Sequence, residues 1–306
     1  MSIVEKAAER LKTLQPEPVL PSEEPVPQPT GPTIERLHER RVRTVDEADA
    51  AEAAPALHID LHALRRAGLL PADDDAGARL ADEVRRVKRP LLDNAYGKSG
   101  KALAHAERIS VTSAVPGEGK TFTAMNLALS LAREPDFEVL LVDGDIPKMD
   151  ITRVLGLEER PGLMDALTGA CRPDDVVVTT DVPNLLVIPA GQRSAVTTEL
   201  FGGRRMEYVL ERLGGDGRQR LLVFDSSPLL ATPESQVLAA HMGQVVIVVS
   251  AGHTREHELK AALECMHDAQ YVGLLLNMSR LPAIENHYYR HYGEFGYTPQ
   301  YQLRDH

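Results

Sequence analysis

From about residue 108 onward, short apolar runs alternate with amphipathic segments. Several of the runs are apolar at nearly every position, which is typical of strands that are covered on both faces of a sheet. The segments between them carry apolar residues at helical spacing. This alternation predicts an α/β fold with a doubly wound, mostly parallel sheet. The predicted strands are 108–113, 138–142, 185–188, 221–224, 244–250 and 271–276, and the predicted helices include 120–133, 199–213, 232–240 and 254–267.

The chain before this alternation has a different pattern. Residues 1–15 carry apolar side chains at helical spacing, which predicts a short amphipathic helix. Residues 16–76 are rich in proline and alanine and predict a largely disordered linker. A further helix is predicted at about 79–92. The compact domain is therefore expected at 77–280, followed by a tyrosine-rich tail at 281–306.

A glycine-containing loop follows the first predicted strand, and residues 113–121 read SAVPGEGKT. A glycine-containing loop between a strand and a helix is typical of a P-loop. Such a loop binds an anion because the glycines turn backbone N–H groups toward it and the helix adds its positive end. The lysine would then reach the β- and γ-phosphates, and the threonine hydroxyl would bind Mg²⁺. The alternative is an ordinary loop that carries Gly-Lys-Thr by chance. The predicted nucleotide contacts are Pro116, Gly117, Glu118, Gly119, Lys120, Thr121 and Phe122.

Aspartates follow two of the predicted strands. Asp143 and Asp145 come after the second strand, and Asp225 comes after the fourth. Because ligands of parallel sheets bind at the carboxyl ends of the strands, these residues and the P-loop should share one site. Asp225 is placed to hold Mg²⁺, and Asp143 or Asp145 could accept a proton from an attacking hydroxyl or water. The alternative is that each strand-end aspartate caps the next helix or turn.

Charge and composition limit the classes of partner. The formal net charge of −11 over 306 residues disfavours unaided binding to nucleic acid or to anionic lipid. No apolar run approaches the roughly 18 residues of a membrane span, and the start lacks the pattern of a signal peptide. Cys171 and Cys265 are far apart and the histidines show no ligand spacing, so we expect a reducing, cytoplasmic setting.

Together these motifs resemble the bacterial tyrosine kinases, called BY-kinases, which belong to the P-loop NTPases of the partitioning and cell-division ATPase group. The family's Walker A loop, Pro-Gly-Glu-Gly-Lys-[Ser/Thr], is matched by residues 116–121. Its Asp-x-Asp Walker A′ motif is matched by Asp143 and Asp145, and its Walker B aspartate by Asp225. The resemblance covers about 80–306. Residues 2–11 and 88–97 look like the subgroup associated with exosortase and exopolysaccharide loci.

Two more features carry the resemblance. Many members have Glu-x-x-Arg-x-x-Arg on a helix that is used for ring-like self-association, and Glu83, Arg86 and Arg89 match this spacing. The alternative for these residues is a solvated helical stripe. Family chains end in a tyrosine cluster that is autophosphorylated. In this chain the corresponding segment, 281–306, is better interpreted as a substrate tail than as part of a core. The alternative is a segment that docks on another subunit. The tail tyrosines are Tyr288, Tyr289, Tyr292, Tyr297 and Tyr301.

The resemblance implies an ATP- and Mg²⁺-dependent protein-tyrosine autokinase that phosphorylates the tails of neighbouring subunits. Lys120 would stabilise the transferring phosphoryl group, and Asp143 would accept the tyrosyl proton with Asp145 assisting. Thr121, Asp145 and Asp225 would hold Mg²⁺. The resemblance also implies that the protein forms a homo-oligomer and controls exopolysaccharide biosynthesis. It implies two partners, a separate membrane chain-length protein as activator and a tyrosine phosphatase. It further implies recruitment to the inner face of the cell membrane.

The chain departs from the patterns at several positions. Ala114 stands for the first glycine of the general P-loop pattern, and Pro147, followed by Lys148, stands where the family often has arginine. Asn277 ends the last predicted strand, where the larger ATPase group often contacts the nucleotide base; the alternative is a turn residue. One alternative function is a partitioning-type ATPase switch, although such proteins have a lysine where Ser113 and Ala114 stand here. The other is a catalytically weak ATP-binding scaffold.

Overall fold

The computed structural model describes residues 56–97, 103–194, 196–215, 219–266 and 271–279, which all lie in a compact unit that begins at Ala54. The predicted helix at 1–15, the proline-rich part of the predicted linker and the tail at 281–306 lie outside these residues. No helix in the described ranges is both long and apolar enough to cross a membrane.

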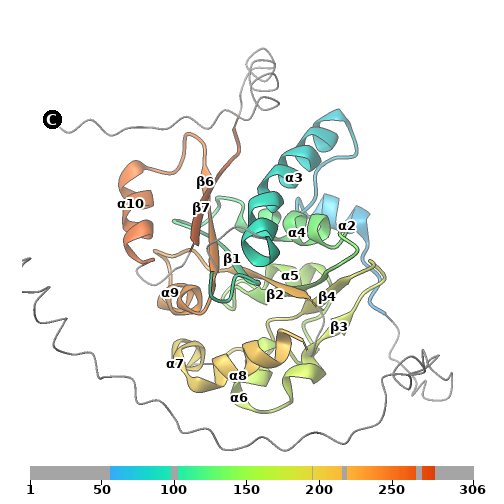
Figure 1. Cartoon of the computed structure of the whole chain (residues 1–306), viewed down its shortest axis with the longest axis vertical. Helices are drawn as coiled ribbons and strands as arrows, with labels where there is room; N and C mark the ends of the chain where they lie inside the picture. Colours follow the sequence, from blue (N-terminus) through green and yellow to red (C-terminus); the bar gives the residue numbers. More distant parts are fainter. Residues whose placement is uncertain (1–55, 98–102, 195, 216–218, 267–270, 280–306) are drawn as a thin grey trace, which may run out of the picture. The chain divides into compact units, whose positions relative to one another are not determined.

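A seven-stranded sheet, in the order β3-β4-β2-β5-β1-β6-β7, forms the centre of the fold (Figure 1). Neighbouring strands are parallel except β3 and β4, which are antiparallel. The register places Asp143 of β2 opposite Asp225 of β5 near the carboxyl ends of the two strands. The strands are β1 (Arg108–Ser113), β2 (Glu138–Gly144), β3 (Val178–Thr179), β4 (Leu185–Ile188), β5 (Arg220–Ser226), β6 (Gln244–Ser250) and β7 (Tyr271–Asn277).

Helices cover both faces of the sheet, and alternate residues of each central strand pack into two different cores. In β5, Leu221 and Val223 belong to one apolar cluster, while Leu222 and Phe224 belong to the other. Burying such a side chain contributes about 1.5–3 kcal/mol, so a strand with both faces covered is apolar along its length. The first cluster contains residues of α2 (Leu61–Arg66), α3 (Asp75–Tyr96), α4 (Lys120–Leu131) and α5 (Asp150–Val154), and the second contains residues of α6 (Leu163–Thr168), α7 (Thr197–Gly202), α8 (Arg204–Leu213), α9 (Pro233–Ala240) and α10 (Glu256–Glu264).

The doubly wound, mostly parallel fold predicted from the sequence is confirmed. All six predicted strands are present, with ends that differ by at most two residues. The structure adds the two-residue strand β3, the short helices α5 and α6, and a 3₁₀ helix, η2 (Pro173–Val176), none of which is long enough to give a periodic pattern. Gly203 divides the predicted helix at 199–213 into α7 and α8.

Residues 57–76 differ from the disordered linker that their composition predicts. Helix α2 forms within this range, and the side chain of Asp60 caps it by accepting hydrogen bonds from the N–H groups of His62 (2.8 Å) and Ala63 (3.0 Å). Leu64 is 1% exposed and packs in the same cluster as β1. A single buried leucine in a charged, alanine-rich segment is too weak a pattern to predict this helix.

Candidate nucleotide-binding site

The P-loop connects β1 to α4 at the carboxyl edge of the sheet. Gly117 and Gly119 have φ angles of 88° and 91°, in the left-handed region that glycine adopts without strain. Gly119 has a second constraint, because a Cβ at this position would lie 2.2 Å from the side-chain Nδ2 of Asn277. The loop is followed directly by the N-terminus of α4, which suits an anion.

Lys120 begins α4 and is only 4% exposed. Its Nζ lies 2.7 Å from Oδ2 of Asp145. Burial lowers the pKa of Lys120, but the charges of Asp225 and Asp145 outweigh burial and leave the pKa above its ordinary value. The lysine is therefore a permanent cation at the P-loop.

Asp225 lies near the end of β5 and is 0% exposed. Neither of its carboxylate oxygens has a hydrogen-bond partner of normal geometry among the described residues. Burial raises the pKa of Asp225 well above its ordinary value, against the opposing effects of the Lys120 charge and the Thr121 hydroxyl. A buried carboxylate with open oxygens beside a hydroxyl has the donor chemistry that a divalent cation requires.

Asp143 has one engaged oxygen and one open oxygen. Its Oδ2 accepts hydrogen bonds from the backbone N–H (2.8 Å) and the hydroxyl (2.7 Å) of Thr152 in α5. Its Oδ1 is buried with no hydrogen-bond partner among the described residues. Burial raises the pKa of Asp143 to about 6. The capping interpretation therefore applies to Oδ2, which binds the first turn of α5, while Oδ1 makes no such contact.

Asp145 connects the P-loop lysine to the loop after β5. Its Oδ2 faces Lys120, and its Oδ1 accepts a hydrogen bond of 2.7 Å from the hydroxyl of Ser227. Ser227 was not among the predicted site residues, and its only sequence signal is its position two residues after Asp225. The ion pair between Asp145 and Lys120 holds the lysine in place. Phosphates must therefore compete with Asp145 for the lysine.

The predicted metal ligands are Thr121, Asp145 and Asp225. In the part of the chain that the structure describes, no three His, Cys, Asp or Glu side chains converge as a complete metal site. Mg²⁺ usually binds through one or two carboxylates together with substrate phosphates and water. The open oxygens of Asp225 beside Thr121 therefore fit a magnesium ion that is held jointly with a nucleotide.

Glu118 fastens the P-loop to neighbouring strands. It is 2% exposed, and its carboxylate accepts hydrogen bonds from the N–H of Val115 (2.8 Å) and from the hydroxyl of Thr254, which follows β6. Its backbone carbonyl accepts a hydrogen bond of 2.9 Å from the side-chain amide of Asn277. Glu118 and Asn277, both predicted as nucleotide contacts, thus contact each other. Thr254 was not predicted, because no motif marks it.

A cavity of about 410 Å³ lies beside these residues. Its walls combine the P-loop, the loop after β2, the end of β7 and the α2–α3 loop, so a segment predicted as linker contributes to the site. Predicted contacts Pro116 and Glu118 do not line this cavity, whereas Lys148 does. The lining residues are Gly68, Leu69, Gly117, Gly119, Lys120, Thr121, Phe122, Lys148, Asp150, Asn277 and Met278.

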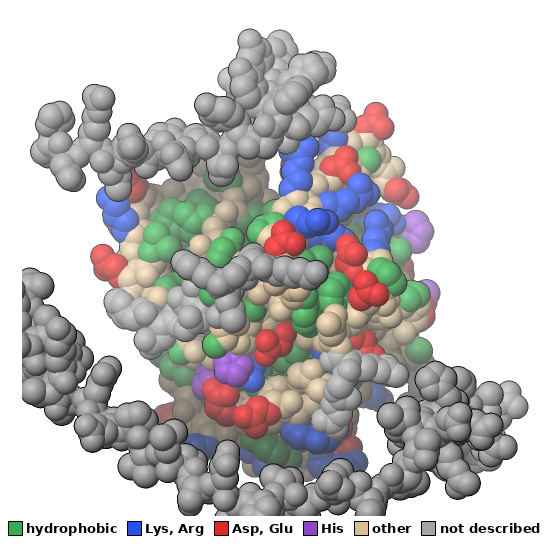
Figure 2. Space-filling model, in the orientation of Figure 1, with side chains coloured by type: hydrophobic (Ala, Val, Ile, Leu, Met, Phe, Trp, Pro, Cys, Tyr) green, Lys and Arg blue, Asp and Glu red, His purple; other side chains and the backbone are tan. Residues whose placement is uncertain are grey.

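The predicted oligomerisation residues Glu83, Arg86 and Arg89 lie on α3 and not at this cavity. All three are exposed, and Lys and Arg side chains gather over α3 in Figure 2. Lys88, by contrast, is buried and contacts a carboxylate oxygen of Glu134 at 2.6 Å. The exposed residues are accessible to a second copy of the chain, as self-association requires, and equally to solvent.

A family model described as an AAA domain matches residues 106–270, more than half of the chain. This range contains the P-loop and the three candidate aspartates. The chain belongs to this AAA domain family. Membership agrees with the geometry of the site, in which the P-loop, Lys120 and Asp225 meet at one edge of a parallel sheet.

Several bacterial tyrosine kinases are similar to this AAA domain protein. Tyrosine-protein kinase YwqD of Bacillus subtilis is 29% identical over 176 residues, which cover 56% of this chain and 73% of YwqD. Tyrosine-protein kinase ptk of Acinetobacter johnsonii is 28% identical over 55% of this chain, which spans only 23% of ptk. The crystal structure of the VpsO kinase domain is 28% identical, covers 68% of this chain and 100% of that chain, and has a TM-score of 0.57. These similarities confirm the resemblance to the bacterial tyrosine kinases.

Proposed function

We propose that the protein is an ATP- and Mg²⁺-dependent protein-tyrosine autokinase that transfers the γ-phosphoryl group to tail tyrosines of neighbouring subunits. The observation that carries this proposal is the meeting of Lys120, Asp143, Asp145 and Asp225 beside the P-loop, at one edge of the sheet. The relatives named tyrosine-protein kinases support the choice of reaction.

Phosphoryl transfer depends mainly on positioning and on stabilising negative charge. The P-loop amides and Lys120 supply this stabilisation, and the lysine acts in a buried setting where its interactions with phosphate are weakly screened. Before a nucleotide binds, Asp145 holds the side chain of Lys120 through an ion pair. Ser227 fixes the carboxylate of Asp145 through a hydrogen bond.

Thr121, Asp145 and Asp225 would hold Mg²⁺ together with the nucleotide. When bound, the ion would neutralise part of the negative charge of the phosphates during transfer. The residues of this chain provide the oxygen donors, and the open oxygens of Asp225 are the strongest support for this assignment.

Asp143 is the proposed acceptor of the tyrosyl proton. A tyrosine hydroxyl, with a pKa of about 10, is a weak nucleophile at neutral pH and needs a base in its vicinity. The phenolic oxygen would bond to the γ-phosphorus as the bond to ADP breaks, and the proton would pass to Oδ1 of Asp143. Thr152 would fix the orientation of the carboxylate through Oδ2.

The substrate tyrosines belong to the tail, and Glu83, Arg86 and Arg89 would bring neighbouring copies into an oligomer that presents one tail to the next site. The proposal includes the wider setting that the family resemblance implies. In this setting a separate membrane chain-length protein activates the kinase, a tyrosine phosphatase opposes it, and the cycle regulates exopolysaccharide assembly at the inner face of the membrane.

The test is incubation of the full chain with Mg-ATP, alone and with candidate activator segments, followed by phosphotyrosine mass spectrometry. We expect Lys120→Met to remove the phosphotyrosine while the protein stays folded. Lys260→Met is the matched control, because Lys260 is an exposed lysine on α10 that pairs with Glu256 at 2.7 Å. ATP hydrolysis without any phosphotyrosine would support the ATPase switch instead, and tight ATP binding without turnover would support the scaffold.

A further inference from the structure

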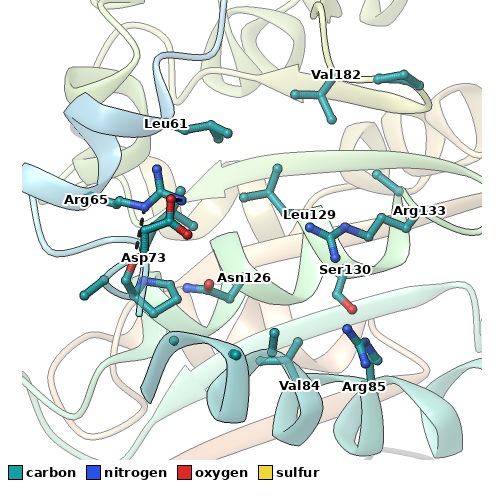
Figure 3. A pocket seen from close by; sticks show the side chains of 18 of the residues that line it. Leu61, Arg65, Asp73, Val84, Arg85, Asn126, Leu129, Ser130, Arg133 and Val182 are labelled. Atoms are coloured by element: carbon teal, nitrogen blue, oxygen red, sulfur yellow. Dashed lines mark hydrogen bonds and ion pairs between the residues drawn. The ribbon is translucent and has the colours of Figure 1, made fainter. Parts of the chain in front are cut away.

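A second cavity, of about 680 Å³, lies between α2, α3, the end of α4 and the β3–β4 turn. We call it the α3–α4 pocket (Figure 3). Its volume falls within the roughly 300–1,000 Å³ of typical small-ligand sites. The α2–α3 loop lies between this pocket and the nucleotide cavity, since Leu69 lines the nucleotide cavity while Leu70 and Pro71 line the α3–α4 pocket.

Most of the wall of this pocket is apolar. Leu61 of α2, Val84 of α3, Leu129 of α4 and Val182 before β4 come from four different elements and surround the same space (Figure 3). An open pocket with apolar walls on several sides suits a flat aromatic ring, which gains by burying its large apolar surface.

One end of the pocket is cationic. Arg85 of α3 and Arg133, which follows α4, reach in from two elements on either side of Ser130 (Figure 3). Arg133 has no ion pair within the described ranges. Arg85 pairs with Asp82 at 2.6 Å, but both side chains are 56% exposed, and such pairs contribute only about 0.2–1 kcal/mol. Both guanidinium groups can therefore turn onto an anion.

The opposite end of the pocket carries one arginine and two aspartates, so it does not attract anions. Arg65 lies 3.7 Å from Asp73, and the side chain of Asp74 accepts a hydrogen bond from the N–H of Gly77 at 2.9 Å as the cap of α3. The pocket thus combines an apolar body with one anion-seeking end. That combination matches a ligand with an aromatic ring and a dianion at its tip.

We propose that the α3–α4 pocket binds phosphotyrosine, and that its occupants are the phosphorylated tyrosines of the tail. This inference rests on the proposed function, which makes those phosphotyrosines the products of the reaction. The ring would lie among the apolar residues, and Arg85 and Arg133 would bind the phosphate, for which guanidinium groups are well shaped. A docked phosphotyrosine is held next to the nucleotide cavity but outside it, so the catalytic carboxylates are left to the next tyrosine.

The test uses a labelled synthetic peptide of residues 285–294 with a phosphate on Tyr289, and fluorescence anisotropy with the full, phosphatase-treated chain in the absence of ATP. We expect binding that is at least about tenfold tighter than that of the unphosphorylated peptide, and a loss of about tenfold in Arg85→Gln/Arg133→Gln. Arg79→Gln/Arg160→Gln removes the same charge from exposed positions outside the pocket and should bind like the wild type.

Equal binding of the two peptides, an equal loss in both double variants, or displacement by the same concentration of inorganic phosphate would each overturn the proposal. So would loss of self-association in Arg85→Gln/Arg133→Gln without any phosphopeptide binding, because the pocket would then be a subunit interface. The peptide is phosphorylated chemically, so its binding does not depend on the chain being a kinase. Failure of the kinase assay and failure of this assay are therefore distinguishable.

Discussion

The side-chain amide of Asn277 donates a hydrogen bond of 2.9 Å to the backbone carbonyl of Glu118. Asn277 ends β7, and Glu118 lies in the P-loop, so the last residue of the edge strand holds the phosphate-binding loop from the side. The contact also makes Asn277 more than a turn residue. It connects the nucleotide site to the point where the chain leaves the sheet toward the tail.

Replacing Asn277 with Ala should therefore weaken nucleotide binding. Loss of one hydrogen bond of this kind costs about 0.5–1.5 kcal/mol, which corresponds to a Kd for ATP up to about tenfold higher. Isothermal titration calorimetry with Mg-ATP measures this change. Asn184→Ala is the matched control, because the Asn184 amide contacts the carbonyls of Ala132 and Glu134 away from the cavity. An unchanged Kd for Asn277→Ala would show that the contact does not order the loop.

The two glycines of the P-loop should respond differently to alanine, although their φ angles are almost equal. A Cβ at position 117 meets nothing within 4 Å, whereas a Cβ at position 119 lies 2.2 Å from Nδ2 of Asn277. Gly119→Ala should thus reduce ATP affinity more than Gly117→Ala. Calorimetry of Gly119→Ala/Asn277→Ala should recover part of the lost affinity, because the second change removes the clash but not the backbone strain. Equal effects of the two single changes would contradict the role given to Asn277.

Much of this site follows from the sequence, because the P-loop and the strand-end aspartates are local motifs in a clear strand and helix pattern. Asp143, Asp145 and Asp225 could be assigned to one edge because parallel strands bring their carboxyl ends together. The contacts that depend on long-range packing could not be derived. Ser227 and Thr254 are ordinary hydroxyl residues in loops, and only the folded chain brings them to Asp145 and Glu118.

The sequence pattern also did not predict the role of residues 57–76 in the fold and at the nucleotide cavity. Composition predicted a linker, whereas α2 packs Leu64 into the core and the following loop lines the nucleotide cavity. The loop is held by the side chain of Asn126, which donates a hydrogen bond of 2.9 Å to the carbonyl of Leu69. A contact between residues 57 positions apart leaves no periodic signal in either segment.

The exposed residues of α3 provide a third prediction. If Glu83, Arg86 and Arg89 make charge pairs between subunits, replacing all three with Ala should shift the protein toward monomer in light scattering and slow autophosphorylation. The slowing follows because the substrate tail belongs to a neighbour. Replacing Asp75, Arg79 and Asp82 of the same helix with Ala is a control for the loss of three exposed charged side chains, although it changes the net charge in the opposite direction. If the wild type oligomerises and the triple variant has the same mass distribution, the stripe is only a solvated surface.

The fourth prediction concerns the effect of phosphorylation on assembly. Each phosphotyrosine adds roughly −1.5 to −2 charges at neutral pH. Several of them would add a dense negative patch to a chain whose net charge is already −11. The tail must approach a site that contains Asp143, Asp145, Asp225 and a polyphosphate, so a heavily modified tail should be repelled from this site, whereas the α3–α4 pocket proposed to bind a phosphotyrosine lies outside it. The repulsion should weaken at high salt, because exposed charges are screened over about 10 Å at 0.1 M ionic strength.

Replacing the five tail tyrosines with Phe should accordingly lock the assembled state and remove most phosphotyrosine, while ATP binding stays unchanged because the P-loop is intact. Light scattering before and after addition of Mg-ATP, with any activator that the kinase needs, measures the assembly, and mass spectrometry measures the modification. The control variant replaces Tyr96, Tyr208 and Tyr271, which lie within the described domain, with Phe. This variant should keep its tail phosphorylation. The idea fails if the tail variant keeps most of the wild-type phosphotyrosine. It also fails if the phosphorylated wild type stays as fully assembled as the unphosphorylated protein, since charge repulsion would then not be the switch.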